Sequence, residues 1–118
     1  MTTSYRLERA LHVERDLRSI LRFLIRSNVQ FGEPFDQAKQ RAYKRVAQIE
    51  DAMEALAAAP HQGTLRREMM PGLRSVTKGR AIFYFTVDDE ARVVRVLAVF
   101  FGGQDHQRAM LMRLVRFK

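Results

Sequence analysis

Residues 81–101 read AIFYFTVDDEARVVRVLAVFF, two apolar runs separated by a short acidic segment. Both runs are rich in aromatic and β-branched residues, which favour strands, and Asp88-Asp89-Glu90 between them is typical of a turn. Beyond Arg95, both alternating sets of residues in the second run are apolar, as in a strand whose two faces are covered. These residues therefore predict two antiparallel strands, the second of them central in its sheet.

A third strand is expected just before this pair. Pro71-Gly72 signals a turn, residues 73–76 can form a short strand, and Lys78-Gly79 suits a two-residue connection because glycine accepts a positive φ. The strands thus cover residues 73–76, 81–87 and 92–101. The aromatic side chains in them read as core packing, with Tyr84 left open between core and an exposed face; the core set is Phe83, Phe85, Phe100 and Phe101.

The first half of the chain has helical periodicity. A short alternating strand at residues 4–10 precedes a helix from about Leu11, and Gly32-Glu33-Pro34 separates that helix from a second one reaching about Ala58. Each helix carries one apolar stripe, which predicts an antiparallel helical hairpin that needs a covering layer. The stripes comprise Val13, Leu17, Ile20, Leu21 and Leu24, then Phe35, Ala38, Ala42, Val46, Ile49, Met53 and Leu56.

A short helix ends the chain. Gly102-Gly103 stops the last strand, Asp105 is placed to cap the helix, and an apolar edge is expected from Met110, Leu111, Leu114 and Phe117. The whole order is strand, helix, helix, three strands and helix, which is an α+β layer arrangement.

The bulk composition narrows the class of protein. A length of 118 residues predicts one domain, residues 1–118, and 47% hydrophobic residues predict that it folds. The absence of cysteine and the wide spacing of the three histidines argue against a metal or other cofactor. Neither a membrane span nor a signal segment is recognisable, so we expect a cytoplasmic protein.

The charge points to an anionic or acidic partner. The net charge is +8, and residues 60–118 hold eleven basic and five acidic residues against ten and eight in residues 1–59. On a helical wheel, four arginines of the first helix fall within about 80° of one another, almost opposite the apolar stripe. This basic row, Arg15, Arg18, Arg22 and Arg26, is either a contact surface or a solvated face balanced partly by Glu14 and Asp16.

The order of elements, together with four segments, resembles the RelE/ParE family of toxins. The segments are residues 56–63, LAAAPHQG, residues 71–75, PGLRS, residues 82–85, IFYF, and residues 93–99, VVRVLAV. The resemblance covers nearly the whole chain. It implies the toxin of a type II toxin–antitoxin, or plasmid stabilisation, module that a cognate antitoxin neutralises.

The family resemblance implies two alternative activities. RelE-like members cut messenger RNA in the ribosome, whereas ParE-like members poison DNA gyrase. The antitoxin, expected to be of ribbon-helix-helix type, orders a disordered tail along the toxin and carries the contacts to operator DNA. The sequence is compatible with a homodimer or a heterotetramer, because an edge strand beside a helix is an association surface.

The residues favour the ParE-like activity. Metal-free RNA cleavage needs a base, an acid and cations around the phosphate. Arg80 lies where the RelE-like pattern places a phosphate-contacting arginine, and Arg74 and Lys78 are nearby candidates. However, the resemblance implies that RelE-like nucleases have another arginine and then an aromatic acid or base after the last strand, whereas here Gln104 is uncharged and residues 105–118 contain no tyrosine, so the catalytic set is incomplete. Residues 101–105 also read FGGQD where ParE-like members commonly have His-Gly-x-Arg-Asp, a departure that favours the alternative of lost toxicity.

His106 is able to titrate near neutrality but reads more simply as a solvated surface residue. We therefore expect gyrase poisoning, with RNA cleavage or a family member that has lost toxicity as alternatives. The residues expected to bind antitoxin or target are Arg15, Arg18, Arg22, Arg74, Lys78, Arg80, Gln104 and Arg108.

Overall fold

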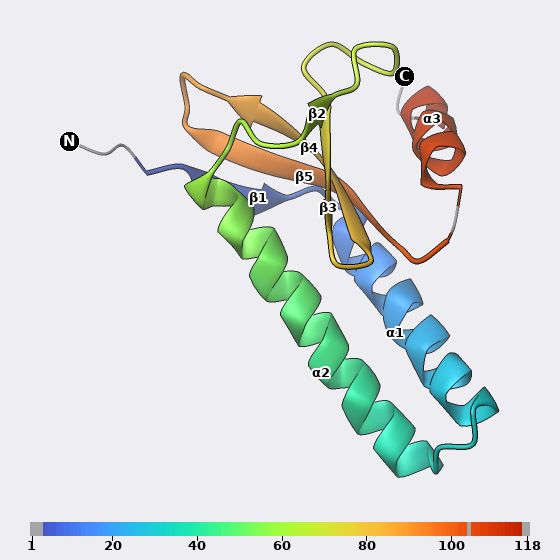
Figure 1. The fold of residues 1–118 in the computed structure, drawn as a ribbon. Helices are drawn as coiled ribbons and strands as arrows, with labels where there is room; N and C mark the ends of the chain where they lie inside the picture. Colours follow the sequence, from blue (N-terminus) through green and yellow to red (C-terminus); the bar gives the residue numbers. More distant parts are fainter. Residues whose placement is uncertain (1–3, 104, 117–118) are drawn as a thin grey trace.

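The protein forms one five-stranded sheet with helices on both faces (Figure 1). The computed structural model describes residues 4–103 and 105–116. Strands β3 (Arg74–Lys78), β4 (Ala81–Asp88) and β5 (Val93–Phe101) form the antiparallel meander that the sequence predicts. Strand β1 (Arg6–Arg9) runs parallel to β5, and the order is β1-β5-β4-β3-β2. The prediction that β5 is a central strand is confirmed.

Strand β2 (Thr64–Leu65) was not foreseen from the sequence. It pairs antiparallel with β3, where Thr64 faces Ser75 and Leu65 faces Arg74. Both of its residues are exposed, so it has no apolar alternation by which a strand is recognised. Only the neighbouring edge of β3 makes this segment a strand.

The β3–β4 turn lies one residue later than predicted. Lys78 and Ala81 face each other across the ladder, so the two connecting residues are Gly79 and Arg80. Gly79 has φ +62°, and a glycine with positive φ at the first turn position is typical of a type II′ turn. Lys78 is therefore the last residue of β3, and Arg80 lies within the turn.

An irregularity in the β4–β5 pairing sets which β5 side chains share a face. Tyr84 faces Ala98 but the next residue, Phe85, faces Val96, so Leu97 is left without a partner. This extra residue is a β-bulge, and it shifts the alternation of β5 by one position. As a result Val96 and Val99, three residues apart, both enter the same core cluster.

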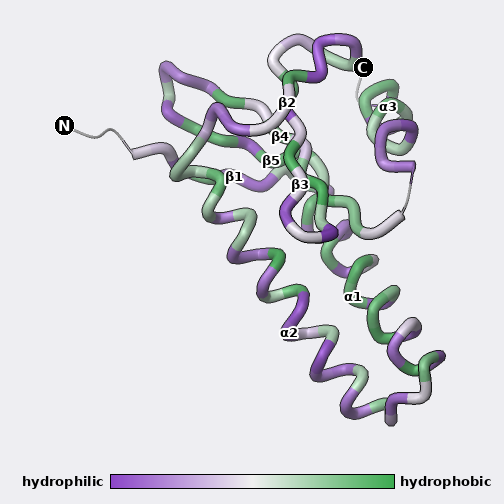
Figure 2. The backbone as a smooth tube through the Cα atoms, in the orientation of Figure 1, coloured by the Kyte–Doolittle hydropathy of each residue, from purple (hydrophilic) through white to green (hydrophobic). Residues whose placement is uncertain are grey.

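The helical hairpin covers one face of the sheet. It consists of α1 (Val13–Gln30) and α2 (Phe35–Glu54), and α2 continues into a 3₁₀ turn, η1 (Ala55–Ala58). Figure 2 shows hydrophilic and hydrophobic residues alternating along both helices, as expected when each has one buried face. The main core cluster lies between the hairpin and the sheet and includes Val13, Leu17, Ile20, Ile49, Met53, Leu56, Phe83, Phe85, Val99 and Phe101.

The far end of the hairpin projects beyond the sheet (Figure 1). Phe35, expected in the buried stripe of α2, is 60% exposed for this reason, and Phe31 is 89% exposed. The prediction that Phe35 is buried was wrong, because the apolar stripe of α2 extends beyond the edge of the sheet that it covers.

Helix α3 (His106–Arg116) packs on the opposite face of the sheet. Asp105 caps it as predicted: its side chain accepts the Arg108 N–H at 3.2 Å and its carbonyl accepts the Ala109 N–H at 3.1 Å. Met110 is buried and Leu114 packs on the same cluster, but Leu111 is exposed, contrary to expectation. Phe117 lies outside the described residues. None of the helices in the described ranges is long and apolar enough to cross a membrane.

A polar cluster joins the N-terminal segment to the β4–β5 turn. The Tyr5 hydroxyl donates to Asp89 Oδ1 at 2.6 Å, and His61 Nε2 lies 2.7 Å from the same oxygen. The hydrogen bond from Tyr5, followed by that from His61, holds the pKa of Asp89 below its ordinary value. Segments that lie far apart in the sequence thus meet at one carboxylate.

We expect Asp89→Asn to lower stability at neutral pH but not in strong acid. Since the folded-state pKa of Asp89 is depressed, its contribution is present above the unfolded-state pKa and is lost as the pH falls through the folded value. Chemical denaturation of both proteins between pH 7 and 2 measures this difference. Asp51→Asn, at an exposed site on α2, is the control, and a pH-independent difference for Asp89→Asn would contradict the assignment.

Candidate functional site

Arg74 is held by backbone oxygens. Its Nη1 donates to the carbonyl of His61 at 2.7 Å and lies 3.4 Å from that of Gln62. Both carbonyls belong to the connection between η1 and β2. Arg74 therefore ties this connection to β3. Lys78 lies at the other end of β3, about 13 Å away for four residue steps of a strand.

Arg80 lies against an aromatic ring instead of a carboxylate. Its guanidinium carbon is 5.2 Å from the centroid of Phe101, and that of Arg45 from α2 is 5.6 Å from the same ring. In the described ranges neither arginine forms an ion pair, although Arg45 bonds the Gln48 side chain at 3.3 Å. Two cations thus meet at one ring without a carboxylate to neutralise them, which favours an anionic group from outside.

Arg45 was missed by the sequence reading because α2 presents it as one more polar residue among many. The resulting group of cations around the β3–β4 turn, Arg45, Lys78 and Arg80, is called the turn cluster below.

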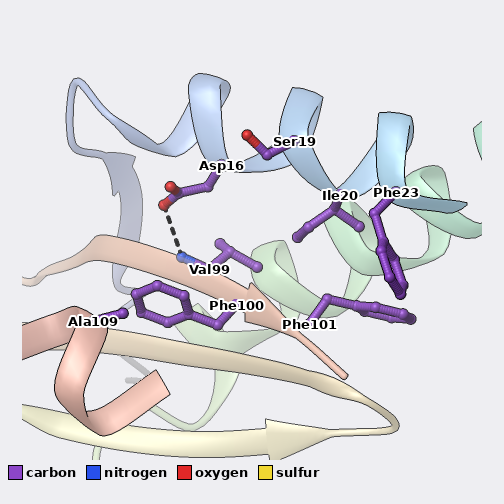
Figure 3. A pocket seen from close by; sticks show the side chains of 8 residues that line it. All are labelled: Asp16, Ser19, Ile20, Phe23, Val99, Phe100, Phe101 and Ala109. Carbon is purple, nitrogen blue, oxygen red and sulfur yellow. Dashed lines mark hydrogen bonds between the residues drawn. The ribbon is translucent and has the colours of Figure 1, made fainter. Parts of the chain in front are cut away.

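A cleft of about 310 Å³ adjoins the turn cluster (Figure 3). It runs between α1, the second half of β5 and the start of α3, with Phe23 and Phe101 near one end and Asp16 at the other. The two rings have centroids 6.3 Å apart, and Phe23 is 47% exposed. β1 pairs with β5 only as far as Val96, so the cleft follows a part of β5 that has no strand partner on this side.

Asp16 closes the inner end of the cleft. It accepts the Val99 N–H at 3.0 Å and makes a two-pronged ion pair with Arg113 of α3, with N–O distances of 2.7 and 2.8 Å. Asp16 is only 8% exposed. The expectation that it balances a solvated basic row was therefore wrong, because it lies on the buried side of α1.

His106 is likewise not a solvated surface residue. Its Nδ1 lies 2.7 Å from the Tyr84 hydroxyl, and the two rings have centroids 5.8 Å apart. Tyr84 itself is fully buried, which resolves the question of its location in favour of the core. Burial raises the pKa of the Tyr84 hydroxyl, so the phenol stays protonated. The start of α3 is thereby fastened to the middle of β4.

The remaining predicted site residues lie elsewhere. Arg15, Arg18 and Arg22 are exposed on α1, and Arg108 is exposed on the first turn of α3. Gln104 lies outside the described residues. The three cations proposed for RNA cleavage are not gathered at one point, since Arg74 is bound at one end of β3 while Lys78 and Arg80 are at the other.

The fold and the composition define a small α+β protein with a net positive charge. The family model for the ParE toxin of type II toxin–antitoxin systems, parDE, matches residues 7–106. The chain therefore belongs to the ParE toxin family and is a ParE/RelE-type toxin of a type II toxin–antitoxin system. The resemblance inferred from the sequence is confirmed. No curated protein gives a significant sequence match.

Solved structures of related toxins share the fold. The chromosomal ParDE system from P. aeruginosa matches with a TM-score of 0.63 and 22% identity, covering 83% of this chain and 96% of that one. The RelBE2 toxin–antitoxin complex from Mycobacterium tuberculosis gives 0.57 and 17%, covering 85% and 100%. A mutant of the E. coli toxin RelE in the free state gives 0.57 and 14%, covering 94% and 97%. Family membership supports an antitoxin as partner.

Proposed function

We propose that this toxin acts by binding and poisoning DNA gyrase, not by cutting messenger RNA. The observation that carries the proposal is the separation of the cleavage candidates. Arg74 is engaged by the His61 carbonyl, and Lys78 lies at the opposite end of β3. A nuclease site needs a base, an acid and cations within reach of one phosphate.

The acid–base groups support the same choice. Tyr84 is buried, and its hydroxyl is already hydrogen-bonded to His106. A tyrosine with a raised pKa and no access to solvent is unsuited to proton exchange with RNA. The match to the ParE family model supports the same choice, because the resemblance to ParE-like toxins implies gyrase poisoning.

The surface proposed for protein partners is the turn cluster with the adjoining cleft. It combines unpaired guanidiniums with exposed aromatic area and an unpaired stretch of β5, features that suit an acidic, partly apolar peptide segment. A cognate antitoxin, of ribbon-helix-helix type and carrying the operator contacts, would neutralise the toxin by ordering its tail there.

The test is induction of the toxin in cells with separate readouts. DNA damage and filamentation without message cleavage support gyrase poisoning, whereas rapid translation arrest with cleaved messages would contradict the proposal. With purified proteins, the measurement is inhibition of supercoiling and accumulation of cleaved DNA by gyrase. A folded, antitoxin-binding protein without either effect would assign the chain to the alternative that has lost toxicity.

Lys78→Ala/Arg80→Ala is expected to weaken gyrase poisoning about tenfold or more while leaving the fold intact, because charged contacts at an interface contribute on this scale. Lys39→Ala/Lys44→Ala, which removes two charges from exposed sites on α2, is the matched control. Circular dichroism and thermal unfolding monitor the fold. An equal loss in the control would show a general charge effect, and selective loss of RNA cleavage would return Lys78 and Arg80 to catalysis.

A further inference from the structure

The basic row on α1 has no ion pair within the described residues, whereas five other arginines are paired with carboxylates. Arg6, Arg9, Arg41, Arg95 and Arg113 each contact a carboxylate within 3.4 Å. In the described part of the chain, no ion pair involves any of the four residues of the row, which are all exposed: Arg15, Arg18, Arg22 and Arg26.

The row continues into a second concave surface. A cleft of about 500 Å³ between the start of α1 and α3 is lined by Arg15 and Arg116, together with His12, Met112 and Arg113. Arg113 is neutralised there by Asp16, whose carboxylate is turned inward. Arg15 and Arg116 have no such acidic partner among the described residues. The positive field therefore extends along α1 and across to α3.

The geometry of the row suits a regular, rigid polyanion. From Arg15 to Arg26 the helix rises about 16 Å, in steps of about 4.5–6 Å between successive arginines. Duplex DNA carries about one negative charge per 1.7 Å of its axis, so several phosphates lie within reach over this length. Guanidinium groups bind phosphate oxygens through two parallel hydrogen bonds, which lysine does not offer.

We propose that α1 contacts the phosphate backbone of duplex DNA directly, through the basic row and without reading its sequence. This is a second binding surface, distinct from the turn cluster, and it does not depend on gyrase being the target. It gives the toxin DNA contacts of its own, in addition to those expected through an antitoxin.

Two features of the structure bear on the choice of anion. Glu14 and Glu50, which line the groove beside Arg18, are both paired with Arg9, at 2.8 and 3.0 Å, so they leave the charge of the row uncancelled. Recognition of single-stranded nucleic acid relies on aromatic stacking surfaces, and the row contains none. The neighbouring Phe23 packs towards Phe101, away from a position between the arginines.

The experiment measures binding of the purified toxin to a fluorescent DNA duplex of about 20 base pairs that lacks the operator sequence. The salt concentration is varied from about 50 to 200 mM, because binding through phosphate contacts weakens steeply over this range. The test variant is Arg22→Gln/Arg26→Gln, and the matched control is Lys39→Gln/Lys44→Gln, which removes the same charge from exposed sites on α2. The test variant should lower affinity roughly tenfold or more and reduce the slope of log K against log salt by about 2. The control should bind like the wild type.

Three outcomes would overturn the proposal. Equal losses in both double variants would mean that only net charge attracts DNA. Tighter binding of single-stranded RNA than of duplex by the wild type would assign the row to RNA. Unchanged DNA binding with lost antitoxin binding would assign it to the protein partner. Gyrase supercoiling is assayed on the same variants, so loss of duplex binding with gyrase poisoning intact supports this proposal separately from the proposed function.

Discussion

Asp16→Ala is expected to lower the free energy of unfolding by about 3 kcal/mol, because it leaves the partly buried guanidinium of Arg113 without its counter-charge. The same change removes the acceptor of the Val99 N–H, which β1 does not reach. Asp16 thus serves α1, β5 and α3 at once.

Thermal and urea unfolding followed by circular dichroism measure the loss. For a domain of this size, the melting temperature should fall by about 10–20 °C. Asp51→Ala, which removes an exposed carboxylate from α2, is the control and should change stability by less than about 0.5 kcal/mol. Similar small effects of the two substitutions would contradict the assigned role of Asp16.

A double variant separates the charge from the packing. Replacing Arg113 with leucine in the Asp16→Ala background removes the unpaired charge, so part of the lost stability should return, since apolar replacement of a buried pair is often close to neutral. Additive losses in the double variant would indicate that the pair contributes by independent contacts instead.

Gly63→Ala has a similarly large expected effect, a loss of about 3 kcal/mol from backbone strain and overpacking together. Gly63 has φ +83°, and a Cβ built on it would overlap the Ser75 carbonyl oxygen, closer than real Cβ atoms approach backbone. It would also lie 3.1 Å from the Val76 Cβ. The loss therefore has two sources, the positive φ and the close approach of β3.

Gly72→Ala is the matched control for the first source. Gly72 has a similar φ of +78°, but nothing lies within 4 Å of its added Cβ. It should lose only about 1–2 kcal/mol, the cost of a left-handed conformation for a residue with a side chain. Urea denaturation of the two variants measures the difference in the free energy of unfolding. Equal losses would mean that β3 shifts away from the added Cβ without a further loss of stability.

Much of the fold was predictable from local patterns. The periodicities of residues 13–24 and 38–56 and the apolar runs of β4 and β5 predicted the hairpin and the meander, because each pattern reports which side of one element is buried. The pairing of the strands is harder to predict from the sequence. The parallel contact of β1 with β5 and the bulge at Leu97 depend on which strands come together, and a pattern within one strand does not contain that information.

The candidate site was predictable only in part. Arg74, Lys78 and Arg80 are close in sequence, and this favoured their being a group. However, Arg74 and Lys78 lie at opposite ends of the five-residue strand β3, and Arg74 is hydrogen-bonded to the His61 carbonyl. Arg45 joins Arg80 at Phe101 from a helix 35 positions away, for which the sequence carries no local signal.

The sequence by itself determined the α+β class, the order of elements, the basic row on α1 and the family resemblance. The first three follow from composition and periodicity along the chain, and the resemblance follows from four short segments together with the order of elements. Only the tertiary structure decided that Asp16 is buried against Arg113, that His106 meets Tyr84 and that two arginines share the ring of Phe101. Such contacts join residues from different elements, and their free energy depends on a burial and a geometry that exist only after the elements have packed.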